Sequence, residues 1–532
     1  MRKLLFAGSL FALSAPAFAD ANGDLTALVD DVWAASLKEQ PVYASALGVN
    51  DYASELGDYT LAAQDRRAAD AAKFLTRLNA IPADTLNAAS KVEAGILRRA
   101  LNSTIEGNSF GQRAINFTTY SSWHQQLAGM AQNLPFRTKA DYESYNARLA
   151  QYARVNDENI AVANVAIKGK YTQPCVTLTG FERTISGLIA SEINKSRFFE
   201  PYAAKRPDAV SEADFAALAK SADATIRNVI HPALNKQLAW YTASYKPACA
   251  TAPGVSAQPG GDKYYAFRIR EETTTSLTAE QIHQIGLSEV TRIRAEMVEV
   301  ATKAGYPSRE AFIQHLRTDP QYYAKTPEEL MEKVARVTKI IDGKMPSLFG
   351  RLPRLPYGIK EIPAETAEGT TTAYYNQGSP EIGISGTYFV NTSKLNQRPF
   401  WEIPALSVHE AVPGHHHQIA LQQELPLSDF RKYGASFTAF TEGWGLYSER
   451  LGIEMGLYDT PAKDMGRLSY EMWRACRLVV DTGIHAKGWS KQQAIAFMTD
   501  NSALSAANIE AEVNRYISWP GQALAYKLGE LK

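Results

Sequence analysis

The segment Gly386-Thr387-Tyr388-Phe389-Val390-Asn391 lies shortly before a helical pattern that begins after Pro404 and carries a histidine cluster. Its aromatic and β-branched residues are typical of a strand, and Thr370–Tyr375 has the same character. From Leu355 onward, Pro and Gly residues separate these short segments. The sequence therefore predicts a small antiparallel sheet immediately before the histidine cluster.

Helical patterns lie on both sides of this sheet. Across residues 24–238, apolar residues recur at three- and four-residue spacing in alanine-rich stretches, and the pattern returns after Pro404. The Gly/Pro/Ser-rich segment Thr251–Gly261 has the composition of a dividing loop. We therefore expect a mostly α-helical chain. Its N-terminal helical region spans residues 20–250, and residues 262–532 form a second region that holds the sheet and is intertwined with the first.

The composition excludes several classes of protein. The 56 Lys and Arg residues balance the 56 Asp and Glu residues, so the chain lacks the basic excess of a general nucleic-acid-binding protein. Three cysteines in 532 residues exclude a disulfide-stapled scaffold. Cys175 and Cys249 lie in loop-like contexts, where they either pair or stay reduced, and the helical, apolar context of Cys476 predicts a buried thiol.

The N-terminus is typical of a secretory signal. Arg2 and Lys3 precede the apolar run Leu4–Leu13, and Ala17-Phe18-Ala19 places small residues where a signal peptidase cleaves. We expect residues 1–19 to be removed, leaving an exported protein, periplasmic or secreted, that is soluble and has no membrane span. No cysteine follows the cleavage site, so we expect no lipid anchor.

The histidine cluster at residues 407–418 reads Ser-Val-His-Glu-Ala-Val-Pro-Gly-His-His-His-Gln and departs from the standard zinc-peptidase motif. In that motif the second histidine follows the first by four residues, because four residues turn a helix by about 400° and place both imidazoles on one face. Here that position is Pro413. The Pro-Gly pair breaks or widens the helix, so that His415, or alternatively His416, returns beside His409 as the second metal ligand.

Glutamates supply the remaining groups of a metal site. Glu442 lies on a predicted downstream helix and completes a set of two histidines and one carboxylate, which is typical of catalytic zinc. Glu410, adjacent to His409, is expected to deprotonate zinc-bound water. Glu449, about two turns after Glu442, is placed to orient a metal-bound histidine. A histidine run also occurs on solvated surfaces and in metal-scavenging tracts, which gives the cluster a non-catalytic interpretation.

Several blocks of the chain resemble the DUF885 family of bacterial proteins, placed by resemblance among the zincin-like, gluzincin-type metallopeptidases. The resemblance covers nearly the whole mature chain, with its specific motifs in residues 370–530. It implies a mostly helical, cleft-containing fold like that of helical metallocarboxypeptidases and oligopeptidases, and we expect two lobes around the cleft with the sheet beside the metal site. Dipeptidyl peptidase III, whose His-Glu motif carries one extra residue and still binds zinc, is a related precedent. The matching blocks are residues 373–376, 386–392, 409–418, 442–449, 481–485 and 515–527.

The same blocks contain candidates for the other roles of a hydrolase. A developing oxyanion needs a hydrogen-bond donor, and a substrate carboxylate needs a cation, for which Arg515 is the candidate. Lys527 is a second candidate cation, and both residues are equally compatible with a surface or structural ion pair, the interpretation that we favour for Lys527. The tyrosines are equally compatible with an aromatic core, and the asparagines with turns. The candidate oxyanion donors are His485, Tyr516 and Tyr526, and the candidate substrate-binding residues beside the strands are Tyr375, Asn376, Tyr388 and Asn391.

These features predict a secreted zinc-dependent metallopeptidase with one zinc ion per chain. We expect a carboxypeptidase or oligopeptidase that hydrolyses short peptides by Glu-assisted attack of zinc-bound water and binds no nucleic acid. Two alternatives stay open, namely a metal-dependent hydrolase of a non-peptide amide and a non-catalytic periplasmic metal- or peptide-binding protein. The binding protein explains the histidines but gives no role to Glu410 beside a ligand, or to Glu442.

Overall fold

The computed structural model describes residues 20–119 and 121–532, so the predicted signal segment, residues 1–19, lies outside the described residues. The fold is mostly helical, as predicted, with one small sheet. In the described part of the chain, no helix is both long and apolar enough to cross a membrane.

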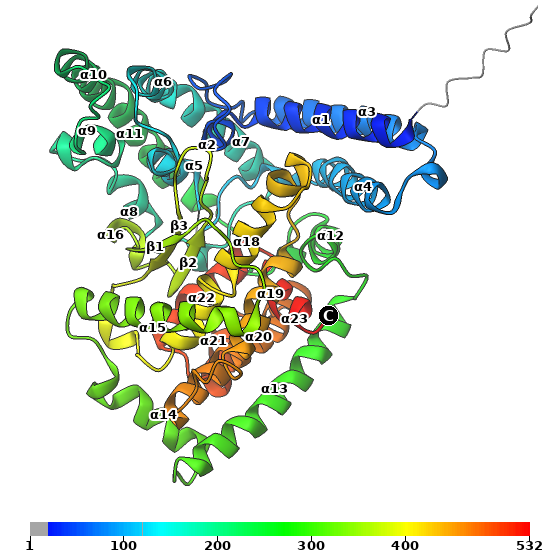
Figure 1. Cartoon of the computed structure of the whole chain (residues 1–532), viewed down its shortest axis with the longest axis vertical. Coiled ribbons are helices and arrows are strands. Elements are labelled where there is room, and N and C mark those ends of the chain that lie inside the picture. Colours follow the sequence, from blue (N-terminus) through cyan, green and yellow to red (C-terminus); the bar gives the residue numbers. More distant parts are fainter. Residues whose placement is uncertain (1–19, 120) are drawn as a thin grey trace, which may run out of the picture.

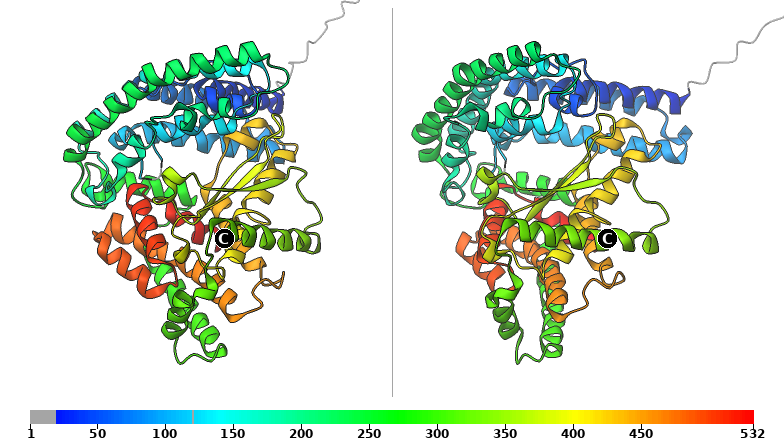
Figure 2. Two further views of the ribbon diagram at one scale, coloured as in Figure 1. Left: turned by 90° about the vertical axis from the view of Figure 1, so that its left-hand side faces the viewer. Right: turned by 60° about the vertical axis from the view of Figure 1, so that its left-hand side comes forward.

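The N-terminal helices form one end of the molecule, where α1, α3 and α4 lie side by side (Figures 1 and 2). Capping side chains fix several of their starts: the Thr60 hydroxyl accepts the Ala63 N–H, and Thr138 forms a reciprocal capping box with Asp141. The longer helices here are α1 Ala21–Glu39, α3 Leu61–Ala80, α4 Ala88–Asn108, α5 Trp123–Gly129, α6 Lys139–Ala150, α7 Tyr152–Gly169, α10 Glu212–Thr225 and α11 His231–Trp240.

The second helical region surrounds α20, Pro461–Lys487, which is buried from Leu468 to Tyr470 and from Met472 to His485. Its longest partner is α13, Ala279–Lys303, which packs along it. The other helices of this region are α12 Gly261–Thr273, α14 Arg309–Thr318, α15 Pro327–Leu348, α17 Ile403–Glu410, α18 His415–Glu424, α19 Thr438–Leu451, α21 Lys491–Asn501, α22 Ala506–Ser518 and α23 Ala525–Glu530.

The sheet is mixed, which corrects the prediction of an antiparallel sheet. Its strands are β1 Tyr357–Glu361, β2 Ala373–Asn376 and β3 Gly386–Val390, in the order β1-β3-β2. The β2 and β3 strands pair antiparallel, as expected, whereas β1 pairs parallel to β3. The connection from β1 carries the short helix α16, Ala364–Ala367, and crosses to the far side of β3 before β2 begins. Two reversals of direction then leave β1 and β3 pointing the same way.

The apolar core is divided between the two ends of the chain. One large cluster joins residues between Leu56 and Tyr245, and another joins residues between Val290 and Ala523. The sheet and α17–α19 lie between the N-terminal helices and the α13–α15 side of the molecule (Figure 2). Cys175 and Cys249, whose pairing the sequence leaves open, form a disulfide. Cys476 is, as predicted, a buried free thiol.

A candidate metal centre at a broken helix

The helix that begins at Ile403 is interrupted between Glu410 and His415, at the predicted Pro-Gly break. The N–H of Gly414 donates to the carbonyl of Val408, which folds the chain back on itself. A Cβ at Gly414 would lie 1.9 Å from the carbonyl oxygen of His409, so only glycine fits here. As a result, the ring centroids of His409 and His415 lie 4.7 Å apart.

Glu442 on α19 completes a group of three candidate ligands. One ligand atom from each of His409, His415 and Glu442 lies within 4.8 Å of the others, and Oε2 of Glu442 lies 3.6 Å and 3.4 Å from the Nε2 atoms of His409 and His415. These separations exceed ordinary hydrogen bonds, and Oε2 of Glu442 is buried without a hydrogen-bond partner in the described chain. Two imidazole nitrogens and an orphaned carboxylate oxygen that face one another fit a zinc ion.

A second glutamate orients the first histidine. Oε1 of Glu449 lies 2.8 Å from Nδ1 of His409, as expected, and 2.8 Å from Nη2 of Arg474 on α20. This nearby carboxylate favours a proton on Nδ1, which leaves the Nε2 lone pair of His409 facing Glu442 and His415.

Burial and neighbouring charges set the protonation of the group. Burial lowers the pKa of His409, but the carboxylates of Glu442 and Glu449 outweigh burial and raise this pKa to about 9. Burial raises the pKa of Glu442, but His415 and His409 hold it well below its ordinary value. Burial is the main cause that raises the pKa of Glu410. The neighbouring His409 and His415 act to lower this pKa, whereas the carboxylate of Glu442 raises it further. A divalent cation would replace the proton on His409 as the charge that balances these carboxylates.

The alternate ligand His416 lies elsewhere. Its Nδ1 contacts the hydroxyl of Tyr375 at 2.9 Å, and its Nε2 contacts the carbonyl of Leu355 at 2.9 Å. Both ring nitrogens are therefore engaged away from His409, and His415 is the histidine that lies beside His409 and Glu442.

Of the three candidate oxyanion donors, only Tyr526 lies beside the metal group. Its ring stacks against His409 with centroids 6.3 Å apart, and its hydroxyl has one long contact, 3.4 Å from Nε2 of Gln522. Burial is the main cause that raises the pKa of Tyr526, and Glu442 raises it further. The phenol therefore keeps a proton that it can donate.

The structure contradicts the catalytic roles predicted for His485 and Tyr516. The Nδ1 of His485 accepts the N–H of Val255 at 3.1 Å, and its Nε2 lies 2.9 Å from the carbonyl of Tyr516, so neither nitrogen is available. The Tyr516 hydroxyl accepts hydrogen bonds from Trp473 and Arg477 in the core. Both residues were predicted from motif membership, which does not reveal partners that arrive from distant segments.

The predicted substrate-carboxylate contact of Arg515 is also wrong for this structure. Its guanidinium is buried and holds Glu512 through Nε at 3.2 Å and Nη2 at 2.7 Å. Lys527 is the structural ion-pair residue that was expected, with partners Glu289, Glu471 and Glu530.

The four candidates beside the strands fall into two pairs. Tyr388 and Asn391 are fully buried, and the Asn391 amide donates to the carbonyls of the 367–371 loop, so their predicted substrate contacts are wrong. Tyr375 is half-buried, with its ring centroid 6.5 Å from that of His415, and Asn376 lines a cavity. The substrate-binding roles of Tyr375 and Asn376 stay predictions.

This cavity has a volume of about 1210 Å³ and lies between the N-terminal helices and the end of β2. Residues of α1, α3 and α4 line one side, and Asn376–Ser379 lines the other. The three candidate ligands are not among its described lining residues, but Tyr375 connects the end of β2 with the His415 ring. The side chains of His415 and Glu442 are 11% and 17% exposed, so the metal group is open to small molecules.

Two residues of this site, Arg474 and Gly445, were not predicted from the sequence. Arg474 lies in an apolar helical stretch and resembled an ordinary core-flanking residue. Gly445 lies within α19 between the two glutamates, and a glycine within a helix is a sequence signal for close packing.

The sequence profile of the family described as "Bacterial protein of unknown function (DUF885)" matches residues 41–532. The chain belongs to the DUF885 family. A solved structure titled "The crystal structure of the putative lipoprotein from Colwellia psychrerythraea" is 27% identical with a TM-score of 0.84, and the match covers 96% of this chain and 92% of that one.

A second solved structure shares the fold of this DUF885 chain. It is titled "The structure of a putative lipoprotein of unknown function from Shewanella oneidensis", with 19% identity, a TM-score of 0.68, and coverage of 96% of this chain and 92% of that one. No match was found among curated proteins.

Proposed function

We propose that this protein is a zinc-dependent peptidase of the zincin-like, gluzincin type that hydrolyses short peptides. The observation that carries the proposal is the triad of His409, His415 and Glu442, in which Oε2 of Glu442 has no hydrogen-bond partner among the described residues. Two nitrogens and one carboxylate oxygen, with a histidine oriented by Glu449, form the donor set of a hydrolytic zinc site. Zinc bound there supplies Lewis acidity toward water and a substrate carbonyl.

Three side chains have the remaining roles in hydrolysis, namely Glu410, Tyr526 and Glu449. Glu410 follows the ligand His409 at the end of α17, where its carboxylate accepts a proton from the attacking water and delivers it to the leaving amine. Tyr526 donates its phenolic proton in a hydrogen bond to the developing oxyanion. Glu449 holds the His409 ring, which keeps the geometry of the site fixed during the reaction.

The cavity between the N-terminal helices and β2 supports a peptide as the substrate. Its walls combine apolar side chains such as Val32 and Met130 with ion pairs such as Arg67–Glu39, so both apolar and charged side chains find partners there. A peptide held at the end of β2 reaches the triad past Tyr375. The sheet edge supplies main-chain hydrogen-bonding groups for an extended substrate.

An exported location is part of the proposal. Residues 1–19 have the order of a secretory signal, and the two similar structures carry lipoprotein titles. The Cys175–Cys249 disulfide is compatible with an oxidising compartment such as the periplasm.

The deciding experiment compares wild type with Glu410→Gln. Metal content is measured by elemental analysis, and hydrolysis of a mixed peptide library is followed by mass spectrometry. We expect both proteins to hold about one zinc ion, and only wild type to cleave peptides. Turnover by Glu410→Gln would refute the role of the base, and a zinc-loaded wild type that cleaves nothing would favour a binding protein.

A further inference from the structure

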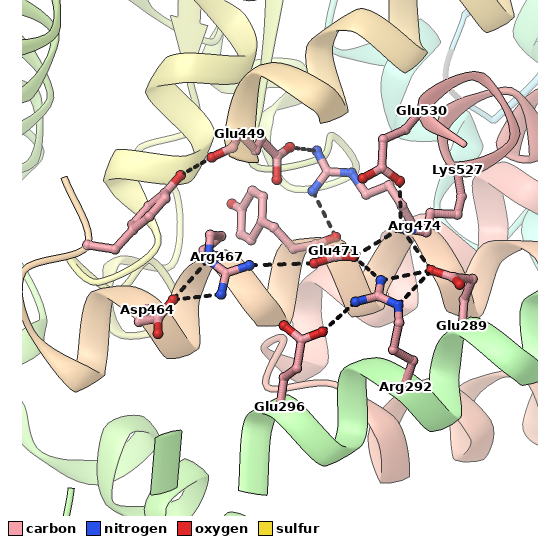
Figure 3. Close-up of polar contacts among 12 residues, drawn as sticks. Glu289, Arg292, Glu296, Glu449, Asp464, Arg467, Glu471, Arg474, Lys527 and Glu530 are labelled. Carbon is pink, nitrogen blue, oxygen red and sulfur yellow. Dashed lines mark hydrogen bonds and ion pairs between the residues drawn. The ribbon is translucent and has the colours of Figure 1, made fainter. Parts of the chain in front are cut away.

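Arg474 is the cation that faces Glu449, and its Nη2 lies 3.4 Å from Nδ1 of the candidate ligand His409. Figure 3 shows this ion pair between α19 and α20. A single oxygen, Oε1 of Glu449, lies 2.8 Å from Nη2 of Arg474 and 2.8 Å from Nδ1 of His409. The orientation of the histidine therefore depends on a carboxylate that is itself held by the arginine.

The surroundings fix the Arg474 guanidinium in one position. Nη1 donates to the carbonyl of Tyr470 at 3.2 Å, and the group stacks over the Trp473 ring at 4.3 Å from its centroid. The side chains of Arg474 and Glu449 are 3% and 2% exposed, so water does not replace either partner. Removing the arginine would leave a buried carboxylate uncompensated.

Arg474 also affects the balance of charge at the site. Glu410 and Glu449 are buried and Glu442 is partly buried at one site, and Arg474 is paired with Glu449. Because Arg474 balances Glu449, the charges of the other two carboxylates are left to match a divalent cation. Without Arg474, the free carboxylate would compete for the metal or draw the His409 ring out of position.

We propose that Arg474 is a positioning residue for the metal centre, which holds Glu449 so that His409 presents Nε2 toward His415 and Glu442. The inference rests on the proposed metal site, and it adds a residue outside the ligand set that sets metal affinity. A lysine in its place would keep the charge but lose the fork that contacts Tyr470 and Glu449 together.

The chain offers a matched control on the same helix. Arg467 lies two turns before Arg474 on α20 and pairs with Asp464 and Glu471 (Figure 3). Its ion-pair partners belong to α20 itself, and neither Glu449 nor a candidate ligand is among them. Arg467→Met therefore removes a largely buried arginine from α20 while the contacts of the metal group stay intact.

The test measures the zinc dissociation constant of the full chain by competition with a chelator. Arg474→Met is expected to weaken zinc binding by roughly 10- to 100-fold, Arg474→Lys by a smaller factor, and Arg467→Met to leave it unchanged. In a Glu449→Gln background, Arg474→Met should cause a smaller loss than in wild type, because Arg474 acts mainly through Glu449, with only a longer contact of 3.4 Å from its Nη2 to Nδ1 of His409. The Co²⁺-loaded absorption spectrum should change in Arg474→Met and not in Arg467→Met.

Wild-type affinity in Arg474→Met and Arg474→Lys would overturn the proposal, as would equal losses in Arg474→Met and Arg467→Met. If Arg474→Met does not fold, Arg474→Lys and its spectrum decide. If the protein is not a peptidase, the result differs. Zinc-loaded wild type would then cleave no peptide, while Arg474→Met would still bind zinc more weakly than wild type. A wild type that binds no divalent metal would overturn both proposals.

Discussion

Gly445 lies directly against the imidazole of His409. A Cβ at Gly445 would come within 2.8 Å of Cε1 and 3.0 Å of Nε2 of that ring. The missing side chain lets α19 approach α17 closely enough for Glu442 to face the two histidines.

Gly445→Ala should therefore weaken zinc binding by about tenfold or more, because the new methyl group displaces the His409 ring. Gly95→Ala is the matched control, since Gly95 also lies within a helix and a Cβ there meets nothing within 4 Å. Titration with zinc by calorimetry measures both. Equal affinities in the two variants would show that His409 tolerates the added methyl group.

The second ligand is tested by comparing adjacent histidines. We expect His415→Ala to lose bound zinc and His416→Ala to retain about one equivalent, since both ring nitrogens of His416 already have partners. Elemental analysis of the purified variants checks this. Zinc loss in His416→Ala with full occupancy in His415→Ala would reverse the assignment.

Two tyrosines provide a paired test of the oxyanion donor. Tyr526→Phe should keep zinc and lower kcat by about 10²- to 10³-fold, because it removes a donor beside the metal group. Tyr516→Phe should leave kcat unchanged and destabilise the fold by about 1–3 kcal/mol, because the donors on Trp473 and Arg477 lose their acceptor. Peptide hydrolysis and chemical denaturation separate the two effects, and a kcat loss confined to Tyr516→Phe would disprove the assignment.

His485 gives a prediction about stability alone. His485→Ala leaves the Val255 N–H and the Tyr516 carbonyl without their buried partner, so we expect a loss of roughly 3–5 kcal/mol in the free energy of unfolding. Zinc stoichiometry should stay at that of wild type. Denaturant unfolding with a metal assay is the check, and loss of zinc from a folded variant would place His485 in the metal site after all.

Local sequence predicted the features that depend on nearby residues. The helix break at Pro413-Gly414 was predictable because proline lacks an N–H and glycine tolerates unusual backbone angles. The strands 373–376 and 386–390 were predictable from their aromatic and β-branched residues, and the candidate ligands from their chemistry. The parallel pairing of β1 was not, because it depends on the path of the crossover through α16.

The sequence by itself determined a helical chain with a broken helix, two histidines beside the break, and a glutamate two helices later. The tertiary structure decided which of the candidates act together. Tyr516 and Arg515 share a motif with Tyr526, and His485 lies in another, yet the polar groups of His485, Tyr516 and Arg515 are held by Val255, Trp473 and Glu512 in the core. Arg474 reaches Glu449 only because α19 and α20 pack together. Spacing along a chain fixes the face of one helix, whereas partners from different helices are set by packing.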